Sequence, residues 1–209
     1  LQARLTDWPK ADIEAQLGRG YPGYWLTFDD EALERQARLM RTAELEHRPL
    51  TVEIRVVSDL DVTEVTIYTQ DHPGLFSRIA GAFAAVSASI VDAKVFTTTE
   101  GMALDVFWLQ DANARAFDQT LALARMSVQI ERALAGEMKR DEAHAERTFV
   151  PERTRVFAVA PRVIIDNQAS ATHTVIEING RDRPGFLYSV TRALYSLSLQ
   201  ISSSKISTY

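Results

Sequence analysis

Hydrophobic and polar residues follow two different periods along this 209-residue chain. Residues 1–48 have helical spacing, with one predicted helix that ends near Gly18 and a second at about 30–47. From Pro49 the period shortens to two: TVEIRVV (51–57) and TEVTIYT (63–69) alternate like half-buried strands. The pattern therefore predicts a helical segment followed by a region that mixes strands and helices.

The mixed region continues as helix, strand, strand and helix. DHPGLFSRIAGAF leads into a predicted helix, and SIVDAKVFTTT and MALDVFWLQ predict two strands joined by a tight hairpin at Glu100-Gly101. A long helix is predicted at about 113–138, and its inward face is taken from Phe117, Leu121, Ala124 and Val128. A charged linker at 137–153 and a further strand, RVFAVAPRVIIDN, broken by Pro161, follow.

An internal duplication is the main feature of the second half. With a shift of 111 residues, identical residues recur inside the same strand–turn–helix–strand pattern. The first copy has Asp71, Pro73, Gly74, Ala82, Ser87, Ile90, Lys94 and Thr97; the second has Asp182, Pro184, Gly185, Ala193, Ser198, Ile201, Lys205 and Thr208.

These elements predict an α+β fold of the ferredoxin-like βαββαβ type. We predict a helical connector at 1–48 and a first domain at 49–166, with an extra N-terminal strand and its last strand after the linker. The second domain, at 171–209, stops after βαβ. Because half of a four-stranded sheet leaves an open edge and an uncovered helix face, either residues are missing or the half-domain docks its strand and helix onto another copy.

The composition narrows the classes of function. The net charge of −5 gives no basic face for a nucleic acid, and no apolar run is long enough to predict a membrane helix. The chain has no cysteine, which excludes disulfides and thiolate metal sites and fits a cytoplasmic location. The start of the chain lacks both a signal-peptide pattern and an initiator Met, so we expect a piece of a longer protein.

The repeated Asp-x-Pro-Gly turn carries the candidate chemistry. Proline suits the first turn of a helix, and glycine lets a ligand approach the backbone. The amides that follow are unpaired at the positive end of the helix dipole, where a carboxylate binds well. Asp71 could accept from a ligand amine, so the turn is complementary to a small zwitterion. The same residues also make a good strand-to-helix turn, and residue chemistry alone leaves the two interpretations open.

Other motifs are weaker. Gly18–Gly23 fits G-x-G-x-x-G, but it follows a helix rather than a strand. Asp59 and Asp61 suggest a hairpin turn, and the four histidines have no metal-ligand spacing. We therefore predict no catalytic residue and no metal site in this chain.

The phrases GLFSRIAGA, IVDAKVFTTTEGMALDVFW, PRVIIDNQAS and THTVIEINGRDRPG resemble ACT domains, which are small regulatory modules that bind amino acids. More narrowly, they resemble the tandem ACT region that closes the bacterial PII-protein uridylyltransferase/uridylyl-removing enzymes. RGYPGYWLTFD is similar to the segment just before that region, so the resemblance covers about 20–209.

This resemblance implies a glutamine-sensing segment. Its implied partners are glutamine, the catalytic domains of the parent enzyme and the PII protein; Mg and UTP would belong to the parent enzyme, and this segment would hold no cofactor. The implied ligand-binding residues are Asp71, His72, Pro73, Gly74, Leu75 and Phe76, and Asp182, Arg183, Pro184, Gly185, Phe186 and Leu187. Weaker candidates are Ile90, Asp92, Ile201 and Ser203.

Two departures from the family pattern bear on the site: His72 replaces the commoner Arg, and the second copy is incomplete. The alternative function is a ligand-free module that forms homo-oligomers through its ACT sheets.

Overall fold

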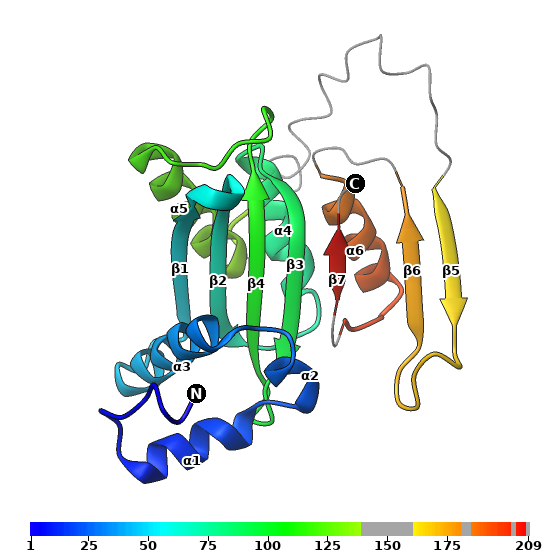
Figure 1. Cartoon of the computed structure of the whole chain (residues 1–209). Helices are drawn as coiled ribbons and strands as arrows, with labels where there is room; N and C mark the ends of the chain where they lie inside the picture. The colour runs from blue at the N-terminus through cyan, green and yellow to red at the C-terminus, as the bar shows by residue number, and fades with distance from the viewer. Residues whose placement is uncertain (139–160, 181–184, 202–203, 208–209) are drawn as a thin grey trace.

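A computed structural model describes residues 1–138, 161–180, 185–201 and 204–207 (Figure 1). Most of the predicted linker at 137–153 lies outside these residues. The elements are α1 (Lys10–Arg19), α2 (Pro22–Trp25), α3 (Asp30–Leu45), β1 (Leu50–Val57), the 3-10 turn η1 (Ser58–Leu60), β2 (Val62–Gln70), α4 (Leu75–Ala85), β3 (Ser89–Thr97), β4 (Met102–Gln110), α5 (Thr120–Leu134), β5 (Arg162–Asp166), β6 (Val175–Asn179), α6 (Phe186–Ser196) and β7 (Lys205–Ser207).

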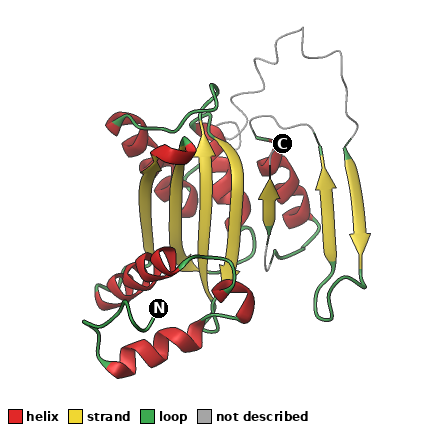
Figure 2. Cartoon of the chain, in the orientation of Figure 1, coloured by secondary structure: helices red, strands yellow, loops and turns green. Residues whose placement is uncertain are grey.

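The centre of the molecule is a five-stranded sheet in the order β1-β2-β4-β3-β7, in which every neighbouring pair is antiparallel. Helices α4, α5 and α6 lie behind this sheet, and α3 crosses the front of its lower end (Figures 1 and 2). The predicted α+β class is confirmed, and the arrangement is consistent with a ferredoxin-like ACT fold. Within the described residues, no helix combines the length and apolar character that a membrane crossing needs.

The two faces of the sheet have separate hydrophobic cores. The rear core joins strand residues such as Ile67 and Phe107 to helix residues such as Phe83 and Ile130, all fully buried. Phe83 and Phe107 meet edge to face, with ring centroids 5.0 Å apart. The front core packs Tyr24 and helix α3 over Tyr68 and Leu104. Alternation along β2 and β4 therefore buries both faces of the same strands.

Strand β5 differs from the prediction. It was assigned as the last strand of the first domain, but it pairs with β6 in a separate two-stranded sheet. The physical reason is that the shift of 111 residues extends further back than expected, so β5 is the counterpart of β1 and β6 that of β2. The register places Val163 opposite Ile178 and Ile165 opposite Ile176, which gathers four aliphatic side chains on one face. Residues before Pro161 lie outside the described part.

The second copy docks onto the first copy of the same chain. Helix α6 packs against α4, and β7 pairs with β3 (Figure 1). In this pairing Lys94 lies opposite Lys205, its own counterpart in the duplication. A register centred on equivalent residues means that a local two-fold axis relates the two copies. The docking predicted for the half-domain thus occurs within one chain.

The helix ends also repeat. Ser87 and its counterpart Ser198 follow α4 and α6 with φ values of 60° and 59°. In each copy the next amide reaches back to the helix: Ala88 donates to the Phe83 carbonyl, and Leu199 donates to the Leu194 carbonyl. These matched helix ends show that the duplicated sequence folds in the same way in both copies where it is described.

Helix α5 is shorter than predicted and shows a different face. It begins at Thr120 because Thr63 anchors the preceding Phe117: the Phe117 amide donates to Oγ1 of Thr63 at 2.8 Å, and that hydroxyl donates to the Phe117 carbonyl at 3.1 Å. This anchor fixes the rotation of the helix, so Met126, Ile130 and Ala133 are buried. The predicted inward face was wrong, since Leu121 is 72% exposed and Val128 is 50% exposed.

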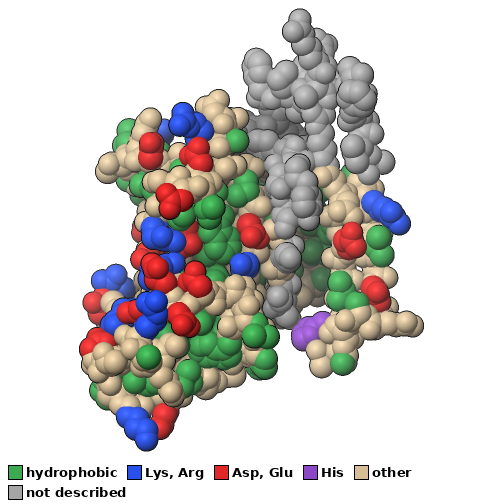
Figure 3. All heavy atoms as spheres, viewed as in Figure 1, with side chains coloured by type: hydrophobic (Ala, Val, Ile, Leu, Met, Phe, Trp, Pro, Cys, Tyr) green, Lys and Arg blue, Asp and Glu red, His purple; other side chains and the backbone are tan. Residues whose placement is uncertain are grey.

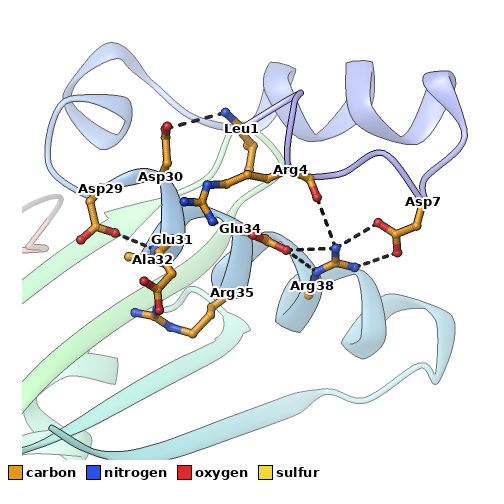
Figure 4. A network of polar contacts seen from close by, with 10 residues as sticks. All are labelled: Leu1, Arg4, Asp7, Asp29, Asp30, Glu31, Ala32, Glu34, Arg35 and Arg38. Atoms are coloured by element: carbon orange, nitrogen blue, oxygen red, sulfur yellow. Dashed lines mark hydrogen bonds and ion pairs between the residues drawn. The ribbon is translucent and has the colours of Figure 1, made fainter.

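Ion pairs hold the N-terminal segment on α3 (Figure 4). Arg38 bridges Asp7, at 2.9 and 3.0 Å, and Glu34, at 3.0 Å, while Arg4 also contacts Glu34. Charged side chains of both signs cover this part of the front face in Figure 3. Exposed pairs of this kind contribute little individually, about 0–1 kcal/mol each, so their effect here is to set the position of the segment.

Leu109 and Leu121 offer a matched test of the rear core. Leu109 is fully buried on β4, whereas Leu121 is exposed on α5. We expect Leu109→Ala to lower the free energy of unfolding by about 2–5 kcal/mol, because it removes buried methyl groups and leaves a cavity. Leu121→Ala should change it by no more than about 0.5 kcal/mol. Urea unfolding of both variants measures this, and equal effects would contradict the described core.

Candidate functional site

The Asp71–Gly74 turn joins β2 to α4 with a left-handed glycine. Gly74 has φ 84° and ψ 0°, a conformation that side chains other than glycine rarely adopt. The Leu75 amide donates to the His72 carbonyl at 3.1 Å, and the Arg78 amide donates to the Gly74 carbonyl at 3.0 Å. The helix begins with no side-chain cap. Its start is therefore built by the backbone of the turn itself.

The first turn of α4 leaves two amides unused. Among the hydrogen bonds of the described residues, none involves the amide of Phe76 or of Ser77. Both amides lie at the positive end of the helix dipole. Phe76 is 6% exposed and Ser77 is 8% exposed, so water cannot freely solvate the amides. This helix end is electrostatically suited to an anionic group.

Asp71 stands at the opposite side of the turn. Its amide donates to the Gly101 carbonyl at 3.1 Å, and its Oδ2 accepts a hydrogen bond from the Thr97 hydroxyl at 2.8 Å. Within the described residues Oδ1 of Asp71 receives no hydrogen bond. The carboxylate is thus held in place by β3 and retains an oxygen that can accept from a ligand.

A cavity lies between this turn and the second copy. Its volume is about 30 Å3, which is room for one or two water molecules. The first copy lines it with the turn, the start of α4 and the facing ends of β3 and β4; the second copy adds α6 and the segment after it. The lining residues are Asp71, His72, Gly74, Leu75, Phe76, Ser77, Val95, Thr97, Ala103, Asp105, Thr191, Tyr195, Leu199, Gln200 and Ile201.

Asp105 is the unexpected member of the lining. It lies in the middle of β4, between Ile67 of β2 and Val95 of β3, and is 1% exposed. Its Oδ1 is buried and has no hydrogen-bond partner. Burial, followed by the negative charge of Asp71, raises the pKa of Asp105 well above its usual value, and the Phe96 amide opposes this only in part. A buried carboxyl group therefore faces the cavity in its neutral form.

Tyr195 of α6 covers the turn. A Cβ atom built on Gly74 would lie 2.9 Å from Cε2 and 3.0 Å from Cδ2 of Tyr195, so the ring rests directly over the glycine. Tyr195 is nevertheless 51% exposed, because its other side faces solvent. Anything larger than water reaches the α4 amides only if this ring moves.

The structure brings together five of the first-copy candidates and one weaker one. Asp71, His72, Gly74, Leu75, Phe76 and Ile201 line the cavity, while Pro73 belongs to the turn but not to the lining. Sequence analysis missed Asp105, Thr97, Thr191 and Tyr195. A charged residue at an inward position of the apolar stretch MALDVFW was the available signal for Asp105. The binding roles of all these residues stay predictions.

The second Asp-x-Pro-Gly turn is placed only in part. Asp182, Arg183, Pro184 and Ser203 lie outside the described residues. Gly185 repeats the left-handed conformation with φ 74° and begins α6, but a Cβ there would meet nothing within 4 Å. Phe186 packs on Gly180, and Leu187 packs on the rear core. Ile90 also packs on that core, and Asp92 of β3 keeps a buried Oδ1 without a partner. None of these lines the cavity.

Metal chemistry has no evident position in the described ranges, where no group of three or more His, Asp and Glu side chains is arranged to hold an ion.

Comparison with known proteins gives a consistent picture. A family model described as an ACR9-like, ACT-like domain matches residues 162–209. Three relatives are named bifunctional uridylyltransferase/uridylyl-removing enzyme. The one from Azospirillum brasilense is 56% identical over 217 residues, covering 100% of the chain and 23% of the relative. Those from Rhodospirillum rubrum and Gluconobacter oxydans are 49% and 47% identical, covering 100% and 96% of the chain and 22% and 21% of the relatives. No solved structure matches the chain.

The fold and the family model define the chain as an α+β protein with an ACT-like domain. It corresponds to a segment of the bifunctional uridylyltransferase/uridylyl-removing enzymes and spans between about a fifth and a quarter of the length of these relatives. The resemblance predicted from the sequence is confirmed.

The buried carboxyl group gives a pH test. Because the folded state keeps the Asp105 proton above the ordinary pKa of 3.8, folding is penalised increasingly as the pH rises from about 4 toward the raised pKa. Asp105→Asn removes this titration. We expect the melting temperature of the variant, relative to the unmodified protein, to increase between about pH 4 and pH 8.

Asp118→Asn, at an exposed position before α5, is the matched control and should show no such trend. A difference between Asp105→Asn and the unmodified protein that stays constant with pH would contradict the buried neutral carboxyl group.

Proposed function

We propose that the chain is the amino-acid-sensing regulatory segment of a bifunctional uridylyltransferase/uridylyl-removing enzyme, with glutamine as its effector. The PII protein is the proposed substrate of the whole enzyme, and the catalytic domains are the proposed recipients of the signal. Mg and UTP are assigned to those domains rather than to this segment. The observation that carries the proposal is a single cavity that joins unpaired helix amides to two carboxyl groups.

The charges of the cavity match the two ends of a free amino acid. The α-carboxylate would accept from the amides of Phe76 and Ser77, and the ammonium group would donate to the free oxygen of Asp71. The side chain would then extend toward Thr191 and Gln200, which supply polar groups from the second copy. In this pose the ligand contacts both copies, so its binding favours one arrangement of the copies over others.

The cavity is smaller than the proposed ligand, and Tyr195 accounts for the difference. Its ring lies against Gly74, in the path to the α4 amides. Tyr195 is half exposed and at the end of α6, where a change of rotamer moves the ring toward solvent. Displacement of this ring is therefore the proposed first step of binding.

The β3–β4 hairpin links the site to the N-terminal helices. Gly101 of the hairpin accepts from the Asp71 amide, and the Thr99 amide donates to the Arg19 carbonyl at the end of α1 at 3.1 Å. Arg19 is also 2.7 Å from Glu44 of α3 and 3.3 Å from Glu100 of the hairpin. We propose this continuous set of contacts as the route by which occupancy of the site reaches residues 1–48.

A ligand-free assembly module is the second candidate function. The exposed aliphatic residues Val163 and Ile165 of the β5–β6 sheet favour it, since such a face pairs readily with another protein surface. Sizing chromatography with and without glutamine separates the candidates, because a purely structural module ignores the amino acid.

Calorimetry tests the leading proposal. We expect one class of glutamine site with preference over glutamate, and we expect Asp71→Asn to weaken binding by roughly 10- to 100-fold because it removes a charge-assisted hydrogen bond. Asp118→Asn, which carries the same substitution at an exposed position, should bind as the unmodified chain does. Wild-type affinity in Asp71→Asn would reject the pose, and no glutamine binding at all would reject the function.

Tyr195→Ala tests the entry step. Removing the ring that covers Gly74 should increase the association rate constant of glutamine, measured by stopped-flow fluorescence of the native tryptophans, by about tenfold or more. Tyr195→Phe retains the ring and should keep the original rate. An unchanged rate in Tyr195→Ala would show that the ligand enters by another path.

A further inference from the structure

Asp105 has no structural explanation in the described protein. It lies at 1% exposure in the middle of a strand, its Oδ1 has no partner, and its strand neighbours Ile67 and Val95 are apolar. An unsatisfied buried polar atom destabilises a fold, and an apolar residue would fill the same place without that cost. The residue is therefore explained better by an interaction with something that enters the cavity.

The surroundings of Asp105 identify the chemistry of that guest. The other ionisable side chains in the described lining are Asp71, His72 and Tyr195, and Asp71 is near enough to disfavour a second negative charge. On the opposite side the unpaired amides of Phe76 and Ser77 favour an anion. Two carboxyl groups on one side and two amides on the other are complementary to a molecule with separate cationic and anionic ends.

Resting on the proposed function, we propose that Asp105 receives the ammonium group of the ligand together with Asp71, so that the site selects ligands with a cationic amine. In the empty cavity Asp105 holds its proton, because burial and Asp71 disfavour the carboxylate. When an ammonium group arrives, the Asp105 O–H bond breaks and its proton passes to solvent. The resulting carboxylate accepts an N–H from the ammonium group.

Proton release distinguishes this role from a structural one. Glutamine binding would be measured by calorimetry near pH 7 in buffers with different ionisation enthalpies, which gives the number of protons exchanged. We expect the unmodified chain to release up to about one proton per glutamine bound, and we expect Asp105→Asn to release close to none. The Asp118→Asn control should release as many protons as the unmodified chain.

Ligand selectivity provides the second measurement. Glutaramic acid is glutamine without its α-amino group, so it cannot use the carboxyl pair. The preference of the unmodified chain for glutamine over glutaramic acid should shrink by about tenfold or more in Asp105→Asn, because one charge-assisted acceptor is lost. The melting profile of the variant establishes that it is folded.

The outcomes separate the two proposals. Glutamine binding that releases no proton, with unchanged selectivity in Asp105→Asn, would overturn the role of Asp105 and leave the sensing function in place. A chain that binds glutamine under none of these conditions would overturn both. Proton release that persists in Asp105→Asn would assign the proton to another group and also reject the inference.

Discussion

The packing of the second copy against the first is the constraint on which the site depends. The second copy contributes only β5, β6, α6 and β7 to the described structure, and these elements cannot enclose a core by themselves. Helix α6 buries its apolar face on α4, and β7 extends the first sheet beyond β3. The same contact encloses the cavity at the Asp71–Gly74 turn, which would otherwise be an open surface. Packing of the repeat and formation of the site are one event.

This packing gives the site its electrostatic character. Burial under α6 removes water from the first turn of α4 and from the carboxyl side chains of β2 and β4. In such a setting unpaired amides and an unpaired carboxyl group are costly, because neither protein nor solvent satisfies them. A complementary ligand removes several of these costs at once. The empty cavity is thus poised to bind, at the expense of stability, which is a common property of regulatory and active sites.

The sequence predicted the local features of the molecule better than its long-range pairings. The Asp71–Gly74 turn and the helix after it followed from the chemistry of proline and glycine, and the duplication followed from identical residues at one spacing. The partner of β5 could not be predicted, because strand pairing depends on which edges meet in space. The rotation of α5 depended on Thr63, which lies 54 residues away from Phe117.

The site was predictable to the same extent. Residues next to the turn were found because the turn is a local motif, whereas Asp105 and Tyr195 reach the cavity only through the sheet and the docked helix. An aspartate within an apolar strand was visible in the sequence, but its direction depends on register, and a slip of one residue would turn it to the other face of the sheet.

The local two-fold axis relates two turns whose surroundings differ. Around Gly74 the second copy supplies Tyr195 and Thr191; the shift of 111 residues places Ala84 and Ala80 at the corresponding positions facing the second turn. Accordingly, Gly74 lies under an aromatic ring, whereas Gly185 has open space where a side chain would begin. The backbone thus repeats while the side chains do not. Since only the first turn also faces a buried carboxyl group, the duplication has produced two turns of one shape with unequal binding chemistry, and the first is the one that the structure equips for a zwitterion.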